Sequence, residues 1–218
     1  MPVWLLDLDG TLYTDRTGLW PVINERITRY VQALLALEAP EAQALRRRWV
    51  QSYGTTLRGL MAEFPDVADP HDYFAFAHDV PLEAYLAPDP RLRDVLTTLS
   101  GTRWVFTNAD AAHARRVLAV LGVDDLMDGI IDIFATGLHP KPQPEAYRRA
   151  LAHAGSPHPD HVVLVDDRLQ NVRGARAYGM RAVWVTRDPE ARQARAADAV
   201  IPDVYHLPDT LGLLQKEA

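Results

Sequence analysis

The strongest constraint on the fold is a regular alternation of helical and strand-like segments in the second half of the chain. Apolar strand-like stretches occupy 103–108, 129–136, 161–167, 181–186 and 197–203. The stretches with helical periodicity are 90–99, 110–122, 143–155, 169–179 and 207–215. Strands connected through helices pair in parallel with right-handed crossovers. The pattern therefore predicts an α/β fold with a parallel sheet, to which the apolar run 3–6 adds a first strand.

A helical block interrupts this pattern directly after the first strand. Ile23, Ile27 and Val31 recur at helical spacing, further amphipathic stretches follow, and a proline-rich connector spans 86–90. We expect residues 15–87 to form a small all-helical domain, and residues 1–14 and 88–218 to form the core. Such an insertion would lie beyond the carboxyl end of the first strand, where open α/β sheets bind ligands.

Polar residues stand at the predicted carboxyl ends of several strands or just beyond them. Each has an ordinary structural explanation as a cap, a turn former or a solvated loop residue, but the carboxyl ends of parallel strands share one edge of a sheet. We therefore expect these residues to converge: Asp7, Asp9, Thr107, Asn108, Lys141, Asp166 and Asp167.

Phosphoryl transfer gives each of these groups a use. The Asp7 carboxylate can attack phosphorus and form an aspartyl-phosphate, while Asp9 protonates the leaving oxygen and then activates water. Thr107 can bind phosphate oxygens, with Lys141 offsetting their charge. Because four carboxylates against one lysine would repel a phosphate dianion, Mg²⁺ is expected in this all-oxygen site.

With these residues identified, the sequence resembles the haloacid dehalogenase-like (HAD) superfamily of phosphohydrolases. The stretches "DLDGT", "FTN", "KPQPEAY" and "LVDD" resemble its four motifs, in order. The resemblance implies a Rossmann-like core with a helical cap domain after the first strand. It also implies Mg²⁺ bound by the Asp7 carboxylate, the Asp9 backbone carbonyl and Asp166, whereas direct metal contact by Asp167 stays open.

More narrowly, "WPVINERITRYV", "YGTTLRGL" and "FTNADAAHARRVLAVLG" resemble the pyrimidine 5′-nucleotidase branch, although that branch often has Asn where this chain has Gly10. The resemblance implies a phosphomonoesterase acting on UMP or CMP. Arg58 is the main candidate for a substrate contact in the cap, in a stretch that equally reads as a helix start capped by Thr55. Tyr13 could stack on a base or anchor the catalytic loop, and Asn108 is a further candidate for substrate binding.

Other activities on this pattern remain open to different degrees. A phosphatase or phosphomutase acting on another small phosphate, such as a sugar phosphate, phosphoglycolate or lysophosphatidate, is the main alternative. A dehalogenase needs neither Asp9 nor Asp166. A phospho-accepting receiver would place its acidic pair on the first strand and its acceptor later, and a pseudoenzyme would be expected to lack one of the groups.

The amino-acid composition excludes some classes of binding partner and metal site. The chain contains no cysteine, which excludes disulfides and thiolate metal sites, and its net charge of −6 disfavours binding to a nucleic-acid backbone. No apolar run approaches a membrane span, and the N-terminus lacks the features of a signal peptide. We expect a soluble cytoplasmic protein, monomeric or homodimeric, whose partner is a small phosphate ester.

Overall fold

A computed structural model describes residues 1–188, 190 and 196–214 of the chain. The chain divides into two compact units. One contains Met1–Asp15 and Leu86–Ala218, and the other is the continuous segment Arg16–Tyr85. We call them the sheet unit and the helical unit, and each is described by itself.

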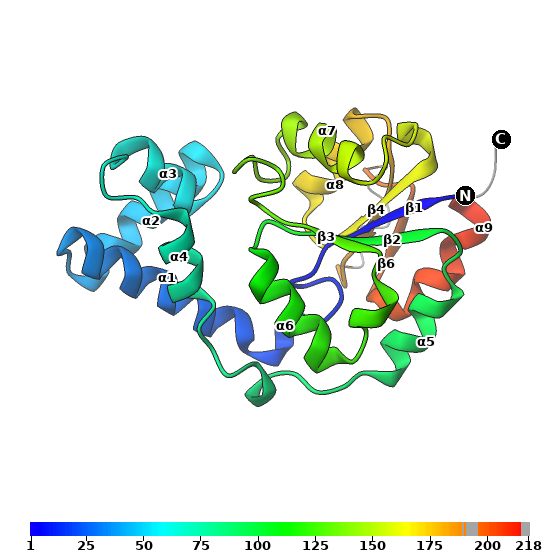
Figure 1. The fold of residues 1–218 in the computed structure, drawn as a ribbon, viewed down its shortest axis with the longest axis horizontal. Coiled ribbons are helices and arrows are strands. Elements are labelled where there is room, and N and C mark those ends of the chain that lie inside the picture. Colours follow the sequence, from blue (N-terminus) through cyan, green and yellow to red (C-terminus); the bar gives the residue numbers. More distant parts are fainter. Residues whose placement is uncertain (189, 191–195, 215–218) are drawn as a thin grey trace. The chain divides into compact units, whose positions relative to one another are not determined.

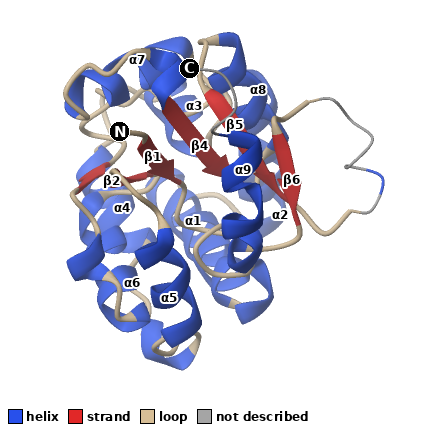
Figure 2. Cartoon of the chain, turned by 90° about the vertical axis from the view of Figure 1, so that its right-hand side faces the viewer, coloured by secondary structure: helices blue, strands red, loops and turns tan. Residues whose placement is uncertain are grey.

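The sheet unit is built on one six-stranded sheet in which every pairing is parallel (Figures 1 and 2). The strand order is β3-β2-β1-β4-β5-β6. β1 is central and buried along its whole length, as its apolar sequence predicts. The strands are β1 (Val3–Leu6), β2 (Thr102–Phe106), β3 (Gly129–Ile131), β4 (Val162–Asp166), β5 (Arg181–Val185) and β6 (Ala199–Ile201).

Helices cover both faces of this sheet, with α7 and α8 on one face and α5 and α6 on the other (Figure 1). The α-helices of the unit are α5 (Pro90–Thr98), α6 (Ala111–Leu121), α7 (Pro144–His153), α8 (Leu169–Ala177) and α9 (Leu211–Leu214). Its 3₁₀ helices include η3 (Asp124–Leu126), η4 (Pro159–His161) and η6 (Val204–Thr210). The predicted helix over 207–215 is thus part 3₁₀ and part α, and its last residue lies outside the described residues. The predicted Rossmann-like parallel α/β fold is confirmed.

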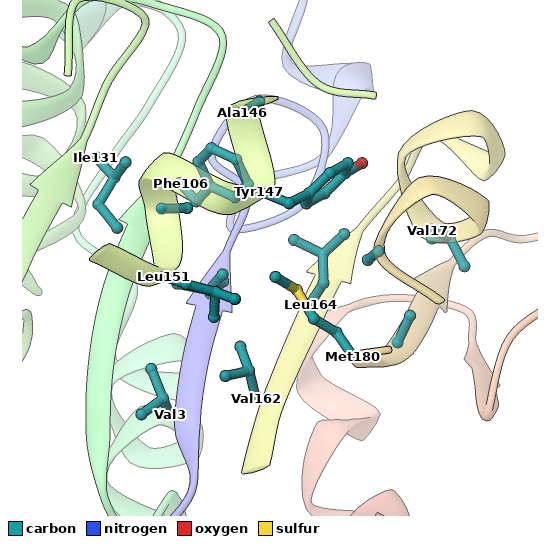
Figure 3. Close-up of a cluster of buried hydrophobic side chains, with 14 residues drawn as sticks. Val3, Phe106, Ile131, Ala146, Tyr147, Leu151, Val162, Leu164, Val172 and Met180 are labelled. Atoms are coloured by element: carbon teal, nitrogen blue, oxygen red, sulfur yellow. The ribbon is translucent and has the colours of Figure 1, made fainter. Parts of the chain in front are cut away.

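The face under α7 and α8 holds a cluster of buried hydrophobic side chains (Figure 3). Leu5 from β1 and Leu164 from β4 meet Tyr147 from α7 and Val172 from α8, and none of the four is exposed to solvent. Tyr147 places its hydroxyl on the backbone carbonyl of Asn171 at 2.7 Å, which satisfies the one polar atom of this large side chain. The cluster packs α7 and α8 against β1 and β4, and this packing holds the carboxyl ends of these two strands in place.

One strand is shorter than its sequence predicts. The apolar stretch 129–136 forms a strand only over Gly129–Ile131. Asp132 ends it, because its Oδ1 accepts a hydrogen bond from the Ala135 N–H at 2.8 Å and its Oδ2 accepts one from the Ala111 N–H at 2.9 Å. The apolar residues beyond it therefore pack in a turn rather than extending the sheet.

The helical unit follows β1 in the chain and contains no strand in its fully described range of 16–85. Ile23 and Val31 of α1 and Trp49 of α2 are completely buried at its centre. Its helices are α1 (Leu19–Leu35), α2 (Ala39–Tyr53), α3 (Thr56–Glu63) and α4 (Pro70–Ala77), with the 3₁₀ turn η2 (Leu82–Ala84); the turn η1 (Asp15–Thr17) leads into it. Within the described part of the chain, no helix has the length and apolar character needed to cross a membrane.

Candidate active site

The candidate site lies where the strand order reverses. β1 has β2 on one side and β4 on the other. From β1 the chain first adds β2 and β3 on one side of the sheet, and then adds β4, β5 and β6 on the other side. Ligands of open α/β sheets bind at the carboxyl ends of the strands at such a point. Asp7 follows β1, Thr107 follows β2 and Asp166 is the last residue of β4.

Lys141 joins two of these strand ends. Its ammonium group donates hydrogen bonds to Asp7 Oδ1 at 2.8 Å, to Asp166 Oδ2 at 2.7 Å and to the Phe106 carbonyl at 2.6 Å. Lys141 is 2% exposed, and Asp166 is not exposed at all. Burial lowers the pKa of Lys141, but the two carboxylates outweigh that effect and leave the pKa raised. The lysine therefore stays protonated between its two acidic partners.

Asp166 is the most completely surrounded carboxylate of the site. Besides Lys141, the Asn171 amide donates to its two oxygens at 2.9 and 3.0 Å, and the Arg168 N–H donates to Oδ1 at 2.9 Å. Asn171 lies in the first turn of α8, directly after the strand that ends in Asp166. These contacts fix the orientation of the carboxylate before any ligand arrives.

The Thr11 hydroxyl links Asp7 to the backbone of Asp167. Its hydroxyl donates to Asp7 Oδ2 at 3.2 Å and accepts a hydrogen bond from the Asp167 N–H at 3.1 Å. The Trp184 indole N–H donates to the Asp167 carbonyl at 2.9 Å. The backbone of Asp167 is thus held from both sides.

Three carboxylates gather closely enough to share a cation. One oxygen each from Asp7, Asp166 and Asp167 lie within 4.8 Å of one another. Burial raises the pKa of Asp7 well above its usual range, with Lys141 opposing the shift and Asp166 and Asp167 adding to it. Burial and Asp166 likewise raise the pKa of Asp167, to about 6. Asp167 Oδ1 is buried without a hydrogen-bond partner in the described part of the chain. An all-oxygen set with one unsatisfied carboxylate oxygen fits a hard cation such as Mg²⁺.

Gly10 makes room for this cluster. Its φ angle is +90°, and a Cβ atom at this position would lie 2.7 Å from Asp167 Oδ2. Both the left-handed backbone and the close carboxylate require glycine here. The residue in which the chain departs from the nucleotidase-like pattern is therefore the one that Asp167 packs against.

Asp9 is not part of the three-carboxylate cluster. Its Oδ1 atom accepts a hydrogen bond from the Tyr13 hydroxyl and lies 2.9 Å from His113 Nε2. Tyr13 is 8% exposed, and burial, followed by Asp9, raises the pKa of its hydroxyl far above the ordinary value. Of the two roles that the sequence leaves open for Tyr13, these contacts favour the anchoring of the catalytic loop.

Asn108 and Thr107 organise the loop beside the lysine. The Asn108 side chain accepts from the Lys141 N–H at 2.8 Å and donates to the Lys141 carbonyl at 3.1 Å. The Thr107 hydroxyl accepts from the Ala109 N–H at 3.0 Å, and Thr107 is 2% exposed. The Asn108 amide thus positions Lys141, which the sequence did not predict, while binding of phosphate oxygens by Thr107 and Asn108 stays a prediction.

Arg58 belongs to the helical unit. Gly54, with a φ angle of +87°, ends α2, and the Thr55 hydroxyl accepts from the Arg58 N–H at 3.2 Å to cap α3. Leu57 and Leu60 of the same helix are buried. The structural interpretation of this stretch therefore applies, and substrate contact by the half-buried Arg58 side chain stays a prediction.

The sequence did not predict a role for three residues of the site, namely Thr11, Asn171 and His113. Thr11 stands in the first motif, yet no role was assigned to its hydroxyl. Asn171 and His113 each stand in the first turn of a helix that follows a strand whose end carries a site residue. Polar residues in the first turns of such helices face the same sheet edge, and this spacing is the signal that could have identified both.

Three comparisons relate the chain to known proteins. A family model described as haloacid dehalogenase-like hydrolase matches residues 1–179. "Phosphate metabolism protein 8" of Saccharomyces cerevisiae is 30% identical over 193 residues, which are 82% of this chain and 59% of that protein. The chain thus spans about three-fifths of the length of this relative. A Thermus thermophilus protein, "Phosphoserine phosphatase", is 31% identical over 88% of this chain and 93% of its own length.

A solved structure supports the fold. The HAD phosphatase from Thermococcus onnurineus superposes with a TM-score of 0.62 at 24% identity, over 97% of this chain and 98% of that one. A likeness at this level of identity concerns the fold alone.

Proposed function

The chain belongs to the haloacid dehalogenase-like hydrolase family, and from this premise we propose that it is a Mg²⁺-dependent phosphomonoesterase that works through an aspartyl-phosphate on Asp7. The observation that carries the proposal is the setting of Asp7. Its carboxylate is buried, receives hydrogen bonds from Lys141 and Thr11, and shares an acidic cluster with Asp166 and Asp167. A carboxylate held in one orientation beside a cation is prepared to attack phosphorus.

The reaction has two half-steps that share this site. In the first, an Asp7 oxygen forms a bond to phosphorus, the bond from phosphorus to the leaving oxygen breaks, and Asp9 gives that oxygen a proton. In the second, Asp9 takes a proton from water, the water oxygen bonds to phosphorus, and the bond to Asp7 breaks. Lys141 and Thr107 offset or bind the charge on the phosphoryl oxygens in both steps.

Magnesium completes the proposal. Asp7, Asp166 and the Asp9 backbone carbonyl would hold the ion, and the unsatisfied oxygen of Asp167 supports a contribution from this residue as well. When bound, the cation neutralises part of the acidic cluster and polarises the phosphoryl group. Without it, Lys141 offsets only part of the combined negative charge of Asp7, Asp166, Asp167 and a phosphate dianion.

For the substrate we propose a pyrimidine nucleoside monophosphate, UMP or CMP. The support comes from the stretches that resemble the pyrimidine 5′-nucleotidase branch, with Arg58 as the proposed contact. Phosphoserine is a second candidate, supported by the Thermus thermophilus relative, which aligns over nearly its whole length. A phosphomutase remains the main alternative reaction, because it would use the same groups and transfer the phosphoryl group instead of releasing it.

The test is phosphate release from a panel of phosphomonoesters with Mg²⁺, with Asp7→Asn as the matched control. The panel holds UMP, CMP, AMP, phosphoserine, sugar phosphates, phosphoglycolate and lysophosphatidate. We expect release from UMP and CMP that disappears in Asp7→Asn and in excess EDTA. Asp7→Asn activity within a few-fold of wild type would refute the nucleophile. Exchange of phosphate between substrates without net release would instead identify a phosphomutase.

A further inference from the structure

The Asp9 carboxylate contacts Tyr13 and His113, neither of which takes part in the proposed reaction steps. The Tyr13 hydroxyl and the His113 ring both meet the same oxygen, Oδ1, and His113 approaches it from a segment 104 residues further along the chain. Two contacts on one carboxylate oxygen fix both the side-chain rotamer and the direction in which the second oxygen points. An acid/base group depends on this direction, because proton transfer requires hydrogen-bond geometry to the reacting oxygen.

His113 stands on a rigid support. Asp110 caps α6 by accepting hydrogen bonds from the Ala112 N–H at 3.1 Å and the His113 N–H at 3.2 Å. The His113 side chain has no solvent exposure. α6 starts after the end of β2, and Asp132 additionally accepts from the Ala111 N–H at its first residue. The imidazole is therefore fixed by the helix start, by burial and by its neighbour Asp9.

We propose that His113 is a positioning residue for the acid/base group of the phosphatase: it holds the Asp9 carboxylate in the orientation that transfers protons to the leaving oxygen and from water. This inference rests on the proposed function. His113 itself gives up and gains no proton in either half-step. When Asp9 is ionised, its oxygens only accept, so the Nε2–H group of His113 donates to Oδ1, as Tyr13 does.

A purely structural role would leave a different kinetic signature. His113 is buried, so its replacement also removes packing contacts, and general damage to the site would slow every substrate alike. If Asp9 loses its orientation as the acid, the reaction should slow only for substrates whose leaving group needs a proton. The departure of an alkoxide from an alkyl phosphate requires protonation, whereas dinitrophenolate leaves dinitrophenyl phosphate as a stable anion. The quantity to compare is kcat/KM, because it covers binding and phosphoryl transfer to Asp7 and excludes the later hydrolysis.

The matched variants are His113→Gln and His113→Asn. Both carry the same amide, but only the Gln amide reaches the position of the histidine Nε2 atom. We expect His113→Asn to lose about 10²-fold in kcat/KM on an alkyl phosphate such as UMP, since misplacement of a catalytic group costs this much. On dinitrophenyl phosphate the same variant should stay within a few-fold of wild type, and His113→Gln should recover most of the loss.

Tyr13→Phe is a second variant that keeps the aromatic ring and removes only the hydroxyl that donates to Asp9 Oδ1. Its loss on the alkyl phosphate and that of His113→Asn should combine to less than their product, because both act through Asp9. Equal losses on the two substrates, or equal activity of the Asn and Gln variants, would overturn the positioning role. Wild-type protein without activity on either substrate would instead overturn the proposed function, and the inference with it.

Discussion

Replacing Lys141 with methionine should cost the protein a large part of its stability. The ammonium group makes its three hydrogen bonds with a side chain that is 2% exposed, to Asp7, Asp166 and the Phe106 carbonyl. Methionine preserves most of the volume and removes the charge, so two acidic groups remain buried beside each other without their cation. Removing one partner of a buried ion pair typically costs about 3–5 kcal/mol, and we expect a loss in this range.

Urea unfolding in EDTA at several pH values measures the loss. Burial already raises the pKa of Asp7, and the lysine opposes that shift, so the variant should raise it further. A carboxyl group with a raised folded-state pKa takes up a proton at low pH and is penalised when ionised. The difference between variant and wild type should therefore be small near pH 5 and grow toward pH 8.

The double variant Lys141→Met/Asp7→Asn provides the control. Removing the Asp7 charge should recover about 1–3 kcal/mol relative to Lys141→Met alone, because the two residues are coupled. At pH 8, a loss of less than about 1 kcal/mol in the single variant, or no recovery in the double variant, would refute the view that Lys141 neutralises this cluster.

Two further predictions concern the acidic cluster. Gly10→Ala and Gly155→Ala should both lose about 1–3 kcal/mol from left-handed backbone strain. Gly10→Ala should lose more in urea unfolding, because only its Cβ would meet a neighbouring atom, Asp167 Oδ2 at 2.7 Å; equal losses would contradict the contact. For Asp167, whose pKa rises from 3.8 to about 6 on folding, stability in EDTA should fall as pH rises through about 6. Asp167→Asn should remove that fall, on the order of 3 kcal/mol, and an unchanged pH profile would contradict the assignment.

The layout of the sheet unit could be predicted from the sequence because its signals are local and repeated. The strands Val3–Leu6 and Val162–Asp166 are buried along their whole length, and apart from the final Asp166 their residues form the continuous apolar stretches typical of a parallel sheet. The helical stretch predicted over 110–122 is α6, which Asp110 caps at its start and Gly122 at its end. The limit of this logic is β3, where the apolar character continues past Ile131 but the hydrogen bonds of Asp132 end the strand.

The contacts inside the site could be predicted only in part. Convergence of Asp7, Lys141 and Asp166 follows from parallel topology, and the three side chains do meet. The partners of Asp9 do not follow from any strand-end rule. His113 reaches Asp9 from the first turn of α6, a position that indicates a place at this sheet edge but does not say which acid the side chain contacts.

Asp7 and Asp9 illustrate how the chain separates two adjacent acids chemically. Alternation along a strand would direct both carboxylates to one spot, but β1 ends at Leu6 and Gly10 turns the backbone with a φ angle of +90°. Asp7 meets the Lys141 ammonium group, which opposes the rise in the pKa of this carboxyl that burial causes. Asp9 meets the Tyr13 hydroxyl and the His113 ring, and the raised pKa of Tyr13 keeps the hydroxyl proton in place. The different partners of the two carboxylates therefore match the different tasks proposed for them.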